Sequence, residues 1–282
     1  MRPTFILARL TFREAVRRRI ALAAILLGLA FLILYNLGFY FIHREITRAG
    51  SVGNAPSAVA RREIYNFLTM AGLYAVTFLS VAMGALVSAD TLAGEIGSGT
   101  IQAIVTKPVR RAEVVLGKWL GFAGLLALYL LLMAGGVVGS VWAQSGYAPP
   151  NFLRGVGLIY LESLLIMSVT LMCSSRISTL ATGGVVFGLY GLAFIGGWVE
   201  QIGSFLNNQT AVNVGILSSL IIPSEVLWKR AAFEMQSPLV AAVGFSPFAA
   251  RSIPSPLMVA YAAGYTLAAL ALAIRWFAQR DL

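Results

Sequence analysis

Long apolar runs, separated by short charged stretches, dominate the pattern of this chain. A helix that crosses a bilayer needs about 20 consecutive, mostly apolar residues. Six runs are long enough, and the fourth carries one acidic residue near its middle, Glu162. The pattern therefore predicts an all-α membrane protein with a single membrane domain over residues 1–282. The expected spans are residues 20–42, 64–89, 119–143, 152–173, 177–199 and 257–274.

Two shorter apolar runs, residues 212–222 and 239–250, lie between the fifth and sixth expected spans. Each is too short to cross a bilayer, and Pro223, Pro238 and Pro254 flank them. We interpret both runs as re-entrant or interfacial segments before the last span. If they were full spans, the topology would change.

Composition agrees with a membrane environment, because 59% of the residues are hydrophobic and only 11% are charged. An ordinary soluble domain carries about 25% charged residues. The net charge of +10 could indicate nucleic acid, but the basic residues lie between apolar runs. Basic flanks of this kind are typical of contact with membrane lipid. We therefore expect lipid around the chain and no nucleic-acid partner.

The distribution of basic residues predicts an orientation. With the N-terminus in the cytoplasm, 13 of the 21 lysine and arginine residues lie on the cytoplasmic side, six of them before the first span. Cytoplasmic flanks of membrane helices carry an excess of such residues. The expected location is the bacterial plasma membrane, crossed several times, with both termini cytoplasmic.

The N-terminal segment, residues 3–19, has helical periodicity. Arg9, Arg13 and Arg17 are spaced by four residues and form one basic stripe, whereas Phe12 lies on a different, apolar side. This pattern predicts an interfacial helix on the inner leaflet. Such a helix could be a plain basic anchor, or an elbow helix that contacts the bundle from the side and moves with it.

Residues 90–118 form the only expected inner loop of real size. A short amphipathic helix is expected near residues 96–105, with Ile101, Ile104 and Val105 on one side. A protruding cytoplasmic helix of this kind suits contact with a protein partner. The alternative is an ordinary solvated loop.

This stretch resembles the signature loop of type-2 ABC exporter permeases, the membrane subunits of ATP-binding-cassette transporters. That signature is roughly E-x-E-x-G-T, an apolar helix, and then P-V-S-R-x-E-x-x-x-G-K. Gly97 and Arg110 depart from it, where a second acidic residue and a serine are common. The most similar branch is the permease associated with maturation of multicopper enzymes, notably nitrous oxide reductase. The matching residues are Glu95, Gly99, Thr100, Pro108, Val109, Arg111, Glu113, Gly117 and Lys118.

The resemblance implies a six-span permease with an elbow helix and a cytoplasmic coupling helix. Two copies of the chain would work with two cytosolic ABC ATPase subunits to export a substrate. The alternative function is a non-transporting scaffold or sensor that recruits a cytosolic partner through residues 90–118. The resemblance implies ATPase coupling for Glu95, Gly99, Thr100, Ile101, Ile104, Pro108, Arg111, Glu113 and Lys118.

Recognisable enzyme chemistry is not found in the sequence. Gly117-Lys118 is followed by Trp119 and does not complete a phosphate-binding loop, so the chain has no recognisable ATP site. A single histidine, His43, and a single cysteine, Cys173, offer no metal-ligand cluster. We expect no cofactor and no enzymatic activity of the chain's own.

Glu162 and a group of glycines have open interpretations. A charge at mid-bilayer costs at least about 2.5–3.5 kcal/mol, so Glu162 is expected to face the bundle or to be protonated. It could serve as a substrate or proton site, or could bind a serine, threonine or tyrosine of another helix. As the acid of a membrane enzyme it would lack a second catalytic group. The fifth span has a small-residue face, for which core packing is favoured over a dimer seam. Its residues are Gly183, Gly184, Gly188 and Gly191.

Overall fold

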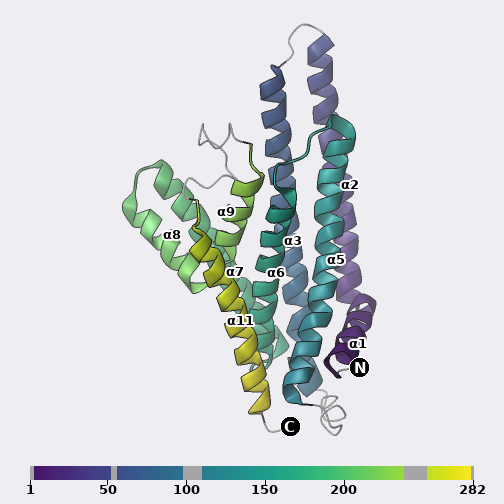
Figure 1. Ribbon diagram of the computed structural model, residues 1–282, viewed down its shortest axis with the longest axis vertical. Helices are drawn as coiled ribbons and strands as arrows, with labels where there is room; N and C mark the ends of the chain where they lie inside the picture. The colour runs from purple at the N-terminus through teal and green to yellow at the C-terminus, as the bar shows by residue number, and fades with distance from the viewer. Residues whose placement is uncertain (1–2, 52–55, 98–109, 238–252, 281–282) are drawn as a thin grey trace.

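The computed structural model describes residues 3–51, 56–97, 110–237 and 253–280, and within these ranges every regular element is a helix. Figure 1 shows the helices as one elongated bundle, with both chain termini at the same end, here called the terminal end. The opposite end is called the far end. The helices are α1 (Pro3–Arg17), α2 (Arg19–Ser51), α3 (Ala58–Gly97), α5 (Arg111–Ser145), α6 (Phe152–Ser174), α7 (Thr179–Phe205), α8 (Gln209–Ile221), α9 (Ser224–Met235) and α11 (Pro256–Ala278).

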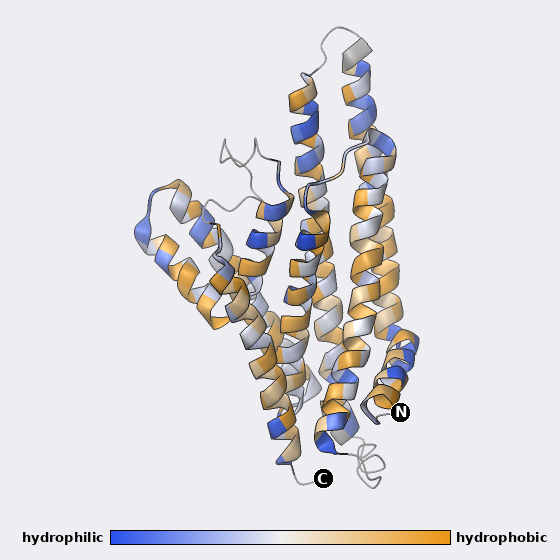
Figure 2. Ribbon diagram, in the orientation of Figure 1, coloured by the Kyte–Doolittle hydropathy of each residue, from blue (hydrophilic) through white to orange (hydrophobic). Residues whose placement is uncertain are grey.

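Six of these helices, α2, α3, α5, α6, α7 and α11, are long and apolar enough to cross a membrane. The predicted all-α fold with six spans is therefore confirmed. Hydrophilic residues gather toward the two ends of the long helices, with a hydrophobic zone between them (Figure 2). Helices α2 and α3 extend past the others at the far end (Figure 1). Helices α2 and α3 have 33 and 40 residues, which correspond to lengths of about 50 and 60 Å. The hydrocarbon layer of a bilayer is only about 30 Å thick.

The centre of the bundle is made by α3, α5 and α6. In each of these helices 61% of the most apolar window is buried, compared with 11% in α2. Leu73 of α3, Met133 of α5 and Ile159 of α6 are fully buried there. Because α2 has so few partners within the chain, most of its surface is left for lipid or for another protein.

Helix α1 lies against the terminal half of α5 (Figure 1), and two glycines of α5 permit the contact. A Cβ atom at Gly117 would lie 2.5 Å from the Cβ of Leu7, and one at Gly121 would lie 2.7 Å from the carbonyl oxygen of Ala8. The two backbones can therefore approach closely only because these positions have no side chain. The side contact expected of an elbow helix is present, and its motion stays a prediction.

The segment before the last span contains a sharp bend. Residues 212–222 lie mostly in α8, and α8 and α9 meet at an angle of 106°, as in a broken span or a re-entrant loop. Pro223 lies at the break, and Ile222 before it is extended with φ −145°, because proline disfavours helix in the preceding residue. The second expected segment, residues 239–250, lies outside the described residues.

The sequence did not predict α9, which packs against α6 with most of its residues buried. The helix carries four charged residues, so it does not appear as an apolar run in the sequence. Three of them are paired, since Lys229 forms an ion pair with Glu200 of α7 at 2.6 Å, and Arg230 forms one with Glu234 of α9 itself at 2.7 Å. Paired charges of this kind can be buried at much lower cost than single ones.

Two expectations from the sequence are corrected. Residues 90–97 are the last turns of α3 and 111–118 the first turns of α5, so the connection is residues 98–110 and not the whole stretch 90–118. The polar residues at both helix ends form ion pairs with other segments of the chain, as described below. The helices can therefore continue through these residues. The expected helix near residues 96–105 falls largely on residues that the structure does not describe.

The glycine face of α7 is the second correction. A Cβ atom at Gly183, Gly184, Gly188 or Gly191 would meet no atom within 4 Å. These glycines therefore do not support packing between helices of the same chain, although packing was the favoured interpretation. They form an open strip on the outside of the described bundle.

Candidate functional site

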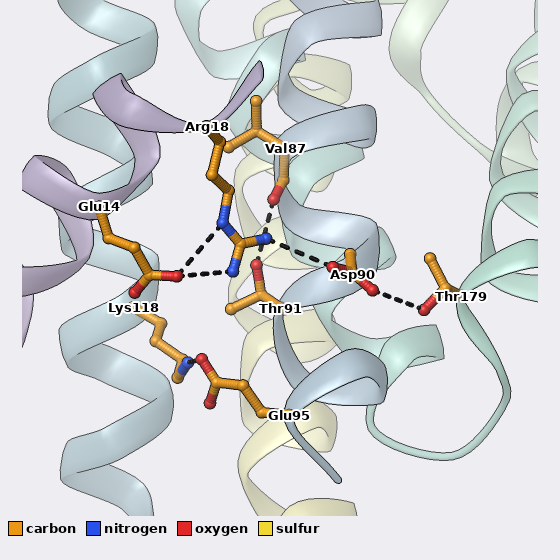
Figure 3. A network of polar contacts seen from close by, with 8 residues as sticks. All are labelled: Glu14, Arg18, Val87, Asp90, Thr91, Glu95, Lys118 and Thr179. Carbon is orange, nitrogen blue, oxygen red and sulfur yellow. Dashed lines mark hydrogen bonds and ion pairs between the residues drawn. The ribbon is translucent and has the colours of Figure 1, made fainter. Parts of the chain in front are cut away.

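A network of ion pairs joins several helices at the terminal end (Figure 3). Arg18 stands at the break between α1 and α2, and its Nη2 donates to Glu14 Oε1 at 2.7 Å. Its Nη1 lies 3.6 Å from Asp90 Oδ2 of α3. Thr179, the first residue of α7, donates from Oγ1 to Asp90 Oδ1 at 3.0 Å. The chain of contacts therefore fixes α1, α3 and the start of α7 to one another.

A second ion pair joins α3 to α5. Lys118 of α5 donates from Nζ to Glu95 Oε1 of α3, and the two side chains are only 6% and 14% exposed. Figure 3 shows this pair beside the Arg18 network. Removing one member of a buried pair leaves the other charge without compensation. The pair thus fixes the end of α3 to the beginning of α5, on both sides of the connection 98–110.

The start of α5 is also fixed at the terminal end. The Arg110 backbone N–H donates to Glu113 Oε2 at 2.9 Å, which is the reciprocal half of a capping box, although Arg110 replaces the usual serine. Arg111 donates from Nη1 to the carbonyl oxygens of Phe277 and Ala278 at 3.4 and 3.0 Å. A cation is favourable there, because the last carbonyls of α11 have no partner within the helix.

The end of α11 is connected in turn to the turn between α6 and α7. Arg280 donates from Nη1 to the carbonyl oxygen of Ser175 at 2.7 Å. The guanidinium of Arg176 lies over the ring of Trp276, 5.1 Å from its centroid. Together with the contacts of Arg18, Lys118 and Arg111 described above, these contacts make a polar layer at the terminal end. It joins residues of α1, α3, α5, α7 and α11 and the turn between α6 and α7.

The sequence-predicted coupling residues divide into two groups. Glu95, Arg111, Glu113 and Lys118 all lie in this layer, on the two helices that the connection joins. The sequence did not predict the Arg18–Asp90 contact. A signal was present, because Arg18 precedes the first apolar run and Asp90 follows the second, which places opposite charges at one membrane edge. The second group of predicted coupling residues lies outside the described residues and comprises Gly99, Thr100, Ile101, Ile104 and Pro108.

Glu162 lies in α6 and points into the bundle, with 1% of its surface exposed. Its Oε2 accepts no hydrogen bond among the described residues, so the structure does not show the expected bond to a serine, threonine or tyrosine at this atom. No group of three or more histidine, cysteine or acidic residues in the described part of the chain could hold a metal ion.

Comparison with known proteins identifies one family. The family described as ABC-2 family transporter protein matches residues 5–282, which is almost the whole chain. A search of curated proteins found no match.

Proposed function

Because the chain belongs to the ABC-2 family of transporter proteins and is therefore a permease component of an ABC transporter, we propose that it couples ATP hydrolysis to substrate export. Membership of this family implies pairing with an ABC ATPase subunit. In the proposal, two such subunits hydrolyse ATP in the cytosol and two copies of this chain form the membrane pathway. The signature loop favours the branch associated with maturation of multicopper enzymes, and that assignment is part of the proposal.

The observation that carries the proposal is the fixation of both ends of the connection 98–110. Glu95 and Lys118 hold the two helix ends together, and Arg111 attaches the second end to α11. A force applied to the connection would therefore act on α3, α5 and α11 together. A coupling element requires such a rigid base, because a flexible one would absorb the movement of the ATPase. The proposal places the ATPase contact in residues 95–106.

We propose that the terminal end faces the cytoplasm of a bacterium. Both termini lie at this end (Figure 1), together with Arg18, Arg111 and Lys118. The excess of basic residues on this side supports the orientation, because such residues flank the cytoplasmic ends of membrane helices. An ATPase in the cytosol could then reach the connection 98–110 directly.

Ile104→Asp is expected to release the ATPase subunit from the membrane. Burial of an isoleucine-sized side chain contributes about 1.5–3 kcal/mol, so its loss should weaken the association by about 10- to 100-fold. Co-purification of the ATPase with the tagged permease measures this effect. Gln102→Asp is the matched control, because it adds the same charge to another side of the expected helix.

The thermal stability of the permease alone should be the same for both variants, since the change lies outside the membrane bundle. ATPase retained by Ile104→Asp at the wild-type ratio would contradict coupling through this segment. If the ATPase binds normally but transport substrates never stimulate it, the scaffold or sensor function is favoured instead.

The open glycine strip of α7 supports the proposed homodimer. Small residues let membrane helices approach closely, and Gly183, Gly184, Gly188 and Gly191 have no partner among the described residues of their own chain. A two-fold axis near this strip would bring each glycine close to its equivalent in the second copy.

Cysteine at Gly184 is therefore expected to form a disulfide with a second copy under mild oxidation, once Cys173 is replaced by serine. Gly135→Cys on α5 is the control, because Gly135 is also open and exposed but lies on another face. We expect several-fold more crosslinked dimer at position 184, measured on denaturing gels. Equal crosslinking at both positions, with a monomeric mass in lipid nanodiscs, would contradict the α7 dimer.

A further inference from the structure

A polar cavity of about 350 Å³ lies at the far end of the bundle, away from the polar layer at the terminal end. It is enclosed by the ends of α2 and α3 and by the turn after α5. This turn is shaped by Gly146, which ends α5 in the left-handed conformation with φ 68°. The side chains that line the cavity and carry polar groups include His43, Thr47, Arg61, Arg62, Tyr65 and Ser145.

The residues that line the cavity carry a net positive charge. None of the described residues that line it is acidic, and two are arginines. In the described part of the chain, the guanidinium groups of Arg61 and Arg62 form no hydrogen bond or ion pair. Arginines elsewhere behave differently, since Arg154 and Arg230 both pair with Glu234, at 3.9 and 2.7 Å. The arginines of the cavity are therefore available to a ligand.

Further groups that favour an anion surround the two arginines. Ala58, the first residue of α3, lines the cavity, so the positive end of the α3 dipole lies beside it. The wall is held in place by a hydrogen bond of 2.8 Å between Tyr65 Oη and His43 Nδ1. Tyr147 lines the cavity in the turn after α5, and burial raises the pKa of its phenol. The phenol therefore remains neutral at physiological pH and adds no negative charge.

We propose that this cavity binds an oxyanion of the phosphate class, held by the guanidinium groups of Arg61 and Arg62. The planar fork of arginine matches phosphate oxygens in two parallel hydrogen bonds, and two adjacent arginines suit a group with more than one charge. The hydroxyls of Thr47 and Ser145 also line the cavity, but they already donate to the carbonyl oxygens of His43 and Val141, at 2.8 and 2.7 Å, so the two arginines are the donors on which the proposal rests. The volume lies at the lower end of the range for small-ligand sites, so it fits a phosphate with a small substituent. The phosphate could be free in solution or belong to the headgroup of an anionic lipid.

The test uses the full-length protein purified in a nonionic detergent without phosphate. Binding of radiolabelled inorganic phosphate is measured at equilibrium, and short-chain phosphatidylglycerol is titrated in a second arm. The variants are Arg61→Gln, Arg62→Gln and the double variant. Arg44→Gln is the matched control, because it removes the same charge from an exposed position beside His43 without lining the cavity.

Saturable binding is expected. Each single variant should weaken it by about 10- to 100-fold and the double variant by more than about 100-fold, because each arginine supplies hydrogen bonds to a charged group. The Arg44→Gln control should stay within about twofold of the wild type, as expected for a screened surface charge. The melting temperatures of all variants should agree, because both arginines are exposed and would lose no hydrogen bond or ion pair with the described residues.

The two arms separate the sources of the phosphate. Binding of inorganic phosphate with this variant pattern supports a soluble ligand, and binding of phosphatidylglycerol alone with the same pattern supports a lipid headgroup. The proposal is overturned if neither ligand binds, or if Arg44→Gln lowers affinity as much as the double variant. The second result would mean that the ligand responds only to the overall charge of the far end.

Discussion

Replacing Lys118 with methionine is expected to lower the free energy of unfolding by about 3 kcal/mol, the largest stability effect of any single change considered for this protein. The reason is electrostatic, because the substitution leaves the Glu95 carboxylate buried without the lysine that faces it. Thermal or denaturant unfolding of the detergent-solubilised permease measures the effect. Methionine keeps most of the length of the lysine stem, so the loss of packing is small.

The control for this prediction is Arg275→Met, which removes a charge from an exposed position in the last turn of α11. That change is expected to cost less than about 0.5 kcal/mol. The double variant Lys118→Met with Glu95→Gln should recover most of the lost stability, since both charges are then absent. If Lys118→Met is no less stable than Arg275→Met, the ion pair does not hold α3 and α5 together.

The second large effect is expected from Gly121→Leu, which should detach α1 from the bundle. A Cβ atom at Gly121 would lie 2.7 Å from the carbonyl oxygen of Ala8 and 2.8 Å from the Cβ of Thr11. The Ala8 contact is with backbone, so a rotamer change cannot relieve it and α1 must move. Overpacking of this kind costs about 1–3 kcal/mol.

The displacement of α1 can be measured by the rate at which a thiol reagent labels Thr11→Cys, with Cys173 replaced by serine. Thr11 is buried against α5, so labelling should be slow in the parent and several-fold faster with Gly121→Leu. Gly139→Leu is the matched control, because the same change on the same helix meets no atom within 4 Å. Equal labelling rates in the two variants would contradict the close α1–α5 contact.

The six spans could be predicted from the sequence because one physical requirement, the thickness of the hydrocarbon layer, determines their length. The same criterion missed α9, whose charges are compensated by partners such as Glu200 that lie far away along the chain. It also ended α3 too early, at residue 89, and began α5 too late, at residue 119. Asp90 and Lys118 look like loop residues until their partners are known, and those partners come from other helices.

The candidate coupling site was predictable in part for a related reason. A motif fixes local spacing, so the sequence indicated Glu95, Arg111, Glu113 and Lys118, although it placed them in an inner loop and not on the two helices that flank the connection. Contacts between distant segments leave no such spacing, and the meeting of Arg18 with Asp90 and of Arg111 with the end of α11 required the fold. From the sequence, Arg61 and Arg62 could be interpreted only as basic residues that flank a membrane span, because the cavity is formed by segments far apart in the chain.

The length of α3 has a mechanical consequence. The helix is continuous from Arg61 beside the far-end cavity to Glu95 in the polar layer at the terminal end, a distance of about 50 Å at 1.5 Å per residue. A straight helix of this length acts as a lever, so that a tilt of about 5° around one end would displace the other by about 4 Å. Arg61 and Arg62 would then shift by more than the length of a hydrogen bond. Movement of the polar layer at the terminal end would thus displace the far end of α3 without any local unfolding.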